Sequence, residues 1–62
     1  MRDEGSKYFI VLNYMRTHGS GRIAEISVGV GFSKSIVSYY LTCLCNDGAI
    51  SHEIGDLWVF LG

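Results

Sequence analysis

The spacing of the hydrophobic residues changes along this chain, and that change constrains the fold more than any other feature. Up to Asp47 the apolar residues recur every three or four positions, as they do on one face of an α-helix. After Gly48 come two strand-like runs, 49–54 and 57–61, rich in Ile, Val, Trp and Phe, which are typical of β-strands. The sequence therefore predicts a mainly α-helical fold that ends in a small β-hairpin (α+β).

Glycine residues mark the breaks between these elements. Gly19 and Gly48 suit the left-handed position after the last turn of a helix, and Gly31 suits a tight turn. The dipeptide Gly55-Asp56 between the strand-like runs predicts a two-residue hairpin turn. The expected helices cover 6–18, 23–29 and 33–47. Three helices followed by a two-stranded wing form a winged helix-turn-helix, and every local signal agrees with it.

The length of the chain limits its stability. With 62 residues it forms a single domain, 1–62, in which we expect residues 1–5 to fray. Such a chain buries only about 60% of its unfolded surface and needs further support. Cys43 and Cys45 point to different sides of a helix, so they neither bridge each other nor hold one metal ion. Oligomerisation is the support that remains.

Composition and charge exclude several classes of protein. A content of 48% apolar and 18% charged residues is too hydrophobic for disorder, and no apolar run is long enough to span a membrane. No signal-peptide pattern follows Met1, so we expect a cytoplasmic protein. The net charge of −1 excludes a generally basic nucleic-acid binder but not a small, locally arranged binding surface.

Nothing in the sequence indicates an enzyme. The chain has no plausible Ser/His/acid arrangement, no phosphate-binding glycine loop and no pair of carboxylates on one face. We interpret His18 as a cation at a helix end and His52 as a residue on a strand surface. We therefore expect no cofactor and no metal ion.

The segment that follows the glycine turn resembles a known family. Residues 31–44 read GFSKSIVSYYLTCL and residues 46–50 read NDGAI. This stretch resembles the recognition helix and wing entry of bacterial and archaeal winged-helix transcription regulators, and 22–26 (RIAEI) resembles their second helix. The resemblance implies that the third helix enters the major groove of DNA while the wing contacts phosphate or the minor groove.

A narrower resemblance is to the PapI/FaeA-like regulators of fimbrial operons, short winged-helix proteins that act on DNA with a larger regulator. Residues 24–26 and 39–41 are similar to that family. Its wings tend to be basic, whereas 51–56 carries two acids and no Lys or Arg.

A second comparison is with the winged helices that bind Z-form nucleic acid. Lys34 and Trp58 match that family in spacing. The family's asparagine and tyrosine on the recognition helix fall on Ser38 and Thr42, and its proline-rich wing is missing. This difference argues against a left-handed duplex as the ligand.

The candidate DNA contacts lie on the N-terminal half and the outer face of the third helix and at the start of the second. The residues placed for phosphate oxygens are Arg22, Ser33, Lys34 and Ser35. The residues placed to read base edges are Ser38, Tyr39 and Thr42.

Structural roles compete with these functional ones. Ser33 is a helix N-cap whatever else it does, and Lys34 alone is equally well an ordinary surface lysine. Tyr40 lies beside the apolar stripe of the third helix, so we expect it to pack while Tyr39 points outward. Trp58, with Phe60, is expected in the core.

Apolar residues remain that a lone monomer leaves exposed. They are Phe9, Ile10, Ile54, Val59 and Leu61. Exposed apolar surface on so small a protein marks an interface, so we predict a homodimer, with a partner protein as the alternative.

The leading hypothesis is a small, homodimeric, sequence-specific DNA-binding transcription regulator. It would act by occupying a promoter, as a repressor does, or by recruiting another regulator. The alternative is a winged-helix module that binds a partner regulator protein rather than DNA, since the acidic wing and sparse cations suit a protein surface.

Overall fold

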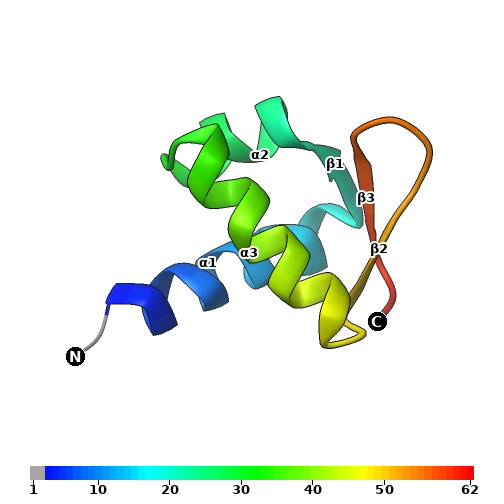
Figure 1. The fold of residues 1–62 in the computed structure, drawn as a ribbon, viewed down its shortest axis with the longest axis horizontal. Coiled ribbons are helices and arrows are strands. Elements are labelled where there is room, and N and C mark those ends of the chain that lie inside the picture. Colours follow the sequence, from blue (N-terminus) through cyan, green and yellow to red (C-terminus); the bar gives the residue numbers. More distant parts are fainter. Residues whose placement is uncertain (1–2) are drawn as a thin grey trace.

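The computed structural model describes residues 3–62, with side chains from Ser6 onward. The described part contains α1 (Asp3–His18), β1 (Ser20–Arg22), α2 (Ile23–Val30), α3 (Lys34–Asn46), β2 (Ile50–His52) and β3 (Leu57–Phe60) (Figure 1). The helices precede an antiparallel hairpin, which confirms the winged-helix fold. We predicted that residues 1–5 fray. Residues 1 and 2 lie outside the described part, and the side chains of residues 3–5 are not described.

Each expected helix forms close to its predicted bounds. α1 starts earlier than Ser6, and its last turn holds Arg16 and His18, where cations complement the helix dipole. Gly19 follows with φ +80°, and its N–H donates to the Met15 carbonyl at 2.7 Å. A left-handed residue at this position therefore ends the helix, as the sequence predicts.

The sheet contains a strand that the sequence analysis missed. β1 pairs with β3 on the side opposite β2, so the predicted two-stranded wing belongs to a three-stranded sheet in the order β1-β3-β2. The strand begins at Ser20, directly after the break that we predicted at Gly19. Gly21 is buried opposite Trp58, and a Cβ there would lie 3.1 Å from Cγ1 of Ile26. The small residue therefore lets the strand lie against α2.

The hairpin turn is wider than the predicted two-residue turn, so that prediction is wrong. β2 ends at His52 and β3 begins at Leu57, and the Glu53 N–H donates to the Leu57 carbonyl at 2.8 Å. The His52 ring stacks on Trp58, and its Nε2 donates to the Gly55 carbonyl at 2.8 Å. These contacts hold the chain in a longer loop.

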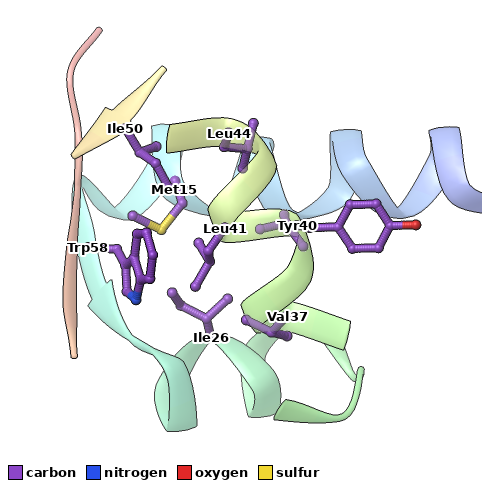
Figure 2. Close-up of a cluster of buried hydrophobic side chains, with 9 residues drawn as sticks. Met15, Ile26, Val37, Tyr40, Leu41, Leu44, Ile50 and Trp58 are labelled. Atoms are coloured by element: carbon purple, nitrogen blue, oxygen red, sulfur yellow. The ribbon is translucent and has the colours of Figure 1, made fainter. Parts of the chain in front are cut away.

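A single cluster of buried side chains joins the helices to the sheet. Figure 2 shows it, with the Tyr40 ring pointing away from the sheet. Its members are Val11, Met15, Ile26, Val37, Tyr40, Leu41, Leu44, Ile50 and Trp58. Tyr40 is 6% exposed and Tyr39 is 63% exposed, which confirms the expected division between packing and outward tyrosine. Trp58 belongs to the core, as expected, and Phe60 packs against it, partly buried.

Tight packing explains the glycine within α2. A Cβ at Gly29 would lie 2.4 Å from Cε2 of Tyr14, whose ring stacks on His18 with centroids 3.9 Å apart. The helix therefore accepts a residue of low helix propensity because α1 approaches its backbone closely.

A hydrogen bond joins α1 to the end of α3. The Tyr8 hydroxyl donates to Oδ2 of Asp47 at 2.5 Å. This bond is the main cause that raises the pKa of Tyr8 above its ordinary value of 10.0, and the negative charge of Asp47 adds to it. Folding therefore favours the protonated phenol, so the bond's contribution is complete below about pH 10 and is lost as the pH rises through the folded pKa.

Replacing Tyr8 by phenylalanine tests this bond. We expect Tyr8→Phe to lower the melting temperature at pH 8, and the difference from the natural protein to shrink above pH 10, because only the natural protein has a phenol to ionise. Thermal unfolding followed by circular dichroism across this pH range measures both. The exposed Tyr39, changed to phenylalanine, is the matched control. A melting-temperature difference that stays constant with pH would contradict the assignment.

Within residues 3–62 no single helix is long and apolar enough to cross a membrane, and the bent pair α2 and α3 reaches that length and composition only when taken together.

Candidate nucleic-acid interface

The turn between α2 and α3 presents the first half of α3 at the surface. The two helices meet at 107°, within the range of helix-turn-helix motifs. Gly31 has φ +79°, and the Ser27 hydroxyl donates to the Phe32 carbonyl at 2.5 Å, which fixes the turn. The Ser33 hydroxyl accepts from the Ile36 N–H at 3.3 Å, so Ser33 is the predicted N-cap. That bond leaves its oxygen only limited capacity for a further partner.

Three of the predicted contact residues meet in an open hollow of about 500 Å³, which we call the wing-side hollow. It lies where α2, α3 and the wing tip converge. Its lining residues are Ile23, Ala24, Lys34, Ser35, Ser38 and Asp56. Lys34 and Ser35 are exposed and Ser38 is half-buried, so an ammonium group and two hydroxyls face one space open to solvent.

Asp56 is the charged residue of this hollow that sequence reasoning did not assign to the interface. Its Oδ1 accepts from Nη1 of Arg22 at 2.8 Å, and the two side chains are 57% (Arg22) and 51% (Asp56) exposed. An ion pair this exposed is worth only about 0–1 kcal/mol, so a phosphate group can compete for Arg22. The pair joins the wing tip to the start of α2, and its only sequence signal is the turn dipeptide Gly55-Asp56.

The Arg22 backbone is also used locally. Its N–H donates to Oε1 of Glu25 at 3.1 Å, so the Glu25 carboxylate satisfies an amide at the start of α2. The acid therefore has a structural role at the position where the helix dipole favours a negative charge.

The remaining α3 residues lie outside the wing-side hollow. Thr42 is exposed, and its Oγ1 donates to the Ser38 carbonyl one turn earlier at 2.9 Å. Its hydroxyl oxygen can still accept a hydrogen bond but its proton is committed. Tyr39 stands edge-on to Tyr40, with ring centroids 5.0 Å apart and planes at 80°.

Tyr39 borders a second, smaller hollow of about 230 Å³ on the other side of α3. We call this space the α1-side hollow. Its lining residues are Lys7, Ser35, Ile36, Tyr39 and Tyr40. The structure thus separates the predicted base-reading residues, because Ser38 and Tyr39 face different spaces.

The wing contributes an aromatic stack. The His52 and Trp58 rings lie 4.0 Å apart at an interplanar angle of 7°. The buried Nε1 of Trp58 has no hydrogen-bond partner among residues 3–62. The Trp58 indole therefore packs in the core and also stacks on His52 of the wing.

The residues predicted to form a dimer interface lie on separate parts of the surface. Phe9 and Ile10 are exposed on α1, Ile54 is 98% exposed at the wing tip and Leu61 is exposed after β3. Val59 is half-buried rather than exposed, because β1 covers the free edge of β3 at the Ser20–Val59 pair.

No three His, Cys, Asp or Glu side chains among residues 6–62 come together as a possible metal site. Cys43 and Cys45 are free thiols, each half-buried.

No protein-family model and no curated protein matches the chain. A solved structure does, the crystal structure of the Zalpha domain from Carassius auratus PKZ in complex with Z-DNA. The TM-score is 0.82 at 21% sequence identity, and the match covers 97% of this chain and 100% of that one. This likeness shows that the chain is a winged helix. It lends no support to the narrower resemblance to PapI/FaeA-like fimbrial regulators.

Proposed function

We propose that this chain is a DNA-binding winged helix that contacts duplex DNA through the first half of α3. The observation that carries the proposal is the wing-side hollow, in which Lys34, Ser35 and Ser38 face one open space between two helices and the wing. Winged helices place these elements against a duplex. The similar solved domain was crystallised in complex with Z-DNA, which supports a nucleic-acid ligand for this fold.

Each residue has a distinct part in this proposal. The Lys34 ammonium pairs with a phosphate, and the Ser35 hydroxyl donates to a phosphate oxygen nearby. Ser38, half-buried in the hollow, reaches a base edge or a sugar, with the limited discrimination that a hydroxyl gives. Arg22 adds a phosphate contact when it leaves Asp56.

The finer proposal is a transcription regulator that acts as a homodimer. With Lys34 and Arg22 as its phosphate contacts, a monomer gives a slope of about −2 when the logarithm of the binding constant is plotted against the logarithm of the salt concentration. So few phosphate contacts mean weak binding. A two-fold dimer doubles these contacts and provides useful affinity. The exposed apolar residues Phe9, Ile10, Ile54 and Leu61 are the surfaces available for such an assembly.

Both hands of the duplex need testing, because the similar solved domain carries Z-DNA. A left-handed duplex has a zigzag backbone, whose phosphates a single hollow can bind without contacts to the bases. Ser38 and Thr42 are shorter than the asparagine and tyrosine that Z-form binders carry there, which favours a right-handed duplex.

The test is fluorescence anisotropy with a mixed-sequence duplex and with an alternating dC-dG duplex held in the left-handed form by bromination. We expect binding that weakens steeply as salt rises, with a slope of about −2 for each bound monomer. Sedimentation in the same buffer gives the oligomeric state. A folded protein that binds neither duplex at low salt would contradict the proposal.

A specific observation favours a second function. Asp56 places a carboxylate in the wing-side hollow, and Ile54 beside it is 98% exposed. An acidic tip with an exposed aliphatic residue suits a protein partner better than phosphate. Under this alternative, replacing Lys34 or Tyr39 leaves partner binding intact, and replacing Ile54 abolishes it.

A further inference from the structure

The two hollows on α3 are neighbours. Ser35 lines both the wing-side hollow and the α1-side hollow, so the spaces meet at the first turn of the helix. Lys34 borders one and Lys7 borders the other. An extended chain laid across this turn would therefore meet an ammonium group on each side.

Lys7 and Lys34 carry positive charges without an ion-pair partner in the described part of the chain, as does Arg16, whose hydrogen bond to the neutral Asn13 amide leaves its charge uncompensated. Among residues 6–62, Arg22 is paired with Asp56, and Nη2 of Arg16 donates to Oδ1 of Asn13 at 2.5 Å. Neither lysine has an ion-pair partner in that part of the chain. On a protein of net charge −1, two uncompensated positive charges thus border the two hollows that meet at the first turn of α3, one from α1 and one from α3.

Among the side chains of residues 6–62, none that lines the α1-side hollow is acidic, whereas Asp56 lines the wing-side hollow. Among the side chains that the structure describes, an anion in the α1-side hollow therefore meets no carboxylate in the lining, whereas one in the wing-side hollow meets Asp56.

Lys7 is held in position before any ligand arrives. It is half-buried, and its Nζ lies 5.9 Å from the centroid of the Phe32 ring, within the range of a cation–π contact. The backbone of Phe32 is itself fixed by the hydrogen bond from Ser27. Less side-chain entropy is then lost when the ammonium binds a ligand.

Resting on the proposed function, we propose that the DNA contact extends across α3 into the α1-side hollow. There the Lys7 ammonium binds a second phosphate of the strand that Lys34 contacts, and the Tyr39 hydroxyl donates to an oxygen of the same sugar–phosphate unit. Tyr39 is 63% exposed beside this hollow, so its hydroxyl is free to turn toward the strand. The ligand class is the nucleic-acid backbone, and no base is read at this point.

The test compares Lys7→Gln, Tyr39→Phe and the control Arg16→Gln in the anisotropy assay over several salt concentrations. Glutamine keeps most of the lysine stem, and circular dichroism confirms that each variant folds. Lys7→Gln should weaken binding about tenfold at low salt and flatten the log–log slope by about 0.9. Tyr39→Phe should weaken binding with the slope unchanged, since it removes a neutral donor. Arg16→Gln should match the natural protein.

The outcomes separate this inference from the function on which it rests. A natural protein that binds duplex DNA, with Lys7→Gln identical to it in affinity and slope, overturns the α1-side contact and leaves the proposed function standing. A natural protein that does not bind overturns both. Lys7→Arg keeps the charge and should restore both the affinity and the slope.

Discussion

Replacing Lys34 by alanine is expected to lower the affinity for duplex DNA about tenfold, whereas Asp56→Asn is expected to raise it several-fold. Both side chains line the wing-side hollow, so they act on the same phosphate with opposite sign. Asp56→Asn also releases Arg22 from its ion pair, which adds a cation to the interface. The two variants therefore shift the affinity in opposite directions without altering the core.

Fluorescence anisotropy at a fixed low salt concentration measures both changes in affinity. Repeating it at several salt concentrations shows whether a change in affinity comes from a lost charge contact or from altered packing against the duplex. Lys34→Ala should flatten the log–log slope by about 0.9, because one counterion fewer is released. Asp56→Asn should leave the melting temperature nearly unchanged, since an exposed ion pair contributes little. Equal affinities for both variants would show that the wing-side hollow does not face the duplex.

Leu41→Ala is expected to leave most of the chain unfolded at room temperature. Leu41 is 0% exposed within the buried cluster that joins α3 to the sheet (Figure 2). Truncating a buried leucine costs about 3–5 kcal/mol, and a domain of this size is stabilised by only about 3–5 kcal/mol. One substitution thus removes most of the free energy of unfolding.

The matched control is the same substitution at Leu61, which is 60% exposed after the last strand. Urea unfolding followed by circular dichroism, at a protein concentration low enough to favour monomers, compares the two variants. Leu61→Ala should keep the midpoint within the range of ordinary surface changes. A cooperative transition of Leu41→Ala near that of the natural protein would show that the cluster tolerates the cavity.

The helix-turn-helix part was predictable because its signals are local. The 107° corner between α2 and α3 follows from Gly31 and the N-cap Ser33, which lie within one turn of each other in the sequence. The inward Tyr40 and outward Tyr39 follow from their places beside the helical stripe. Periodicity and capping depend on residues three or four positions apart, so the sequence shows them directly.

β1 was not predictable in the same way. Ser20, Gly21 and Arg22 carry no alternation of apolar and polar side chains, and β-propensity is low at glycine. The segment becomes a strand because β3 offers it a free edge, in the register Gly21 to Trp58. Such pairing depends on the whole chain having closed.

The sequence by itself determined the three helices, the hairpin and the buried stripe of α3, and it suggested the residues that we propose to bind phosphate. Only the tertiary structure decided which residues distant in the sequence come into contact. Arg22 pairs with Asp56, 34 positions away, and Tyr8 bonds to Asp47, 39 positions away. The tertiary structure also divided α3 between two hollows and placed Lys7 beside one of them. Contacts between distant residues form only when the core packs, because side-chain periodicity specifies a face and not the partner that covers it.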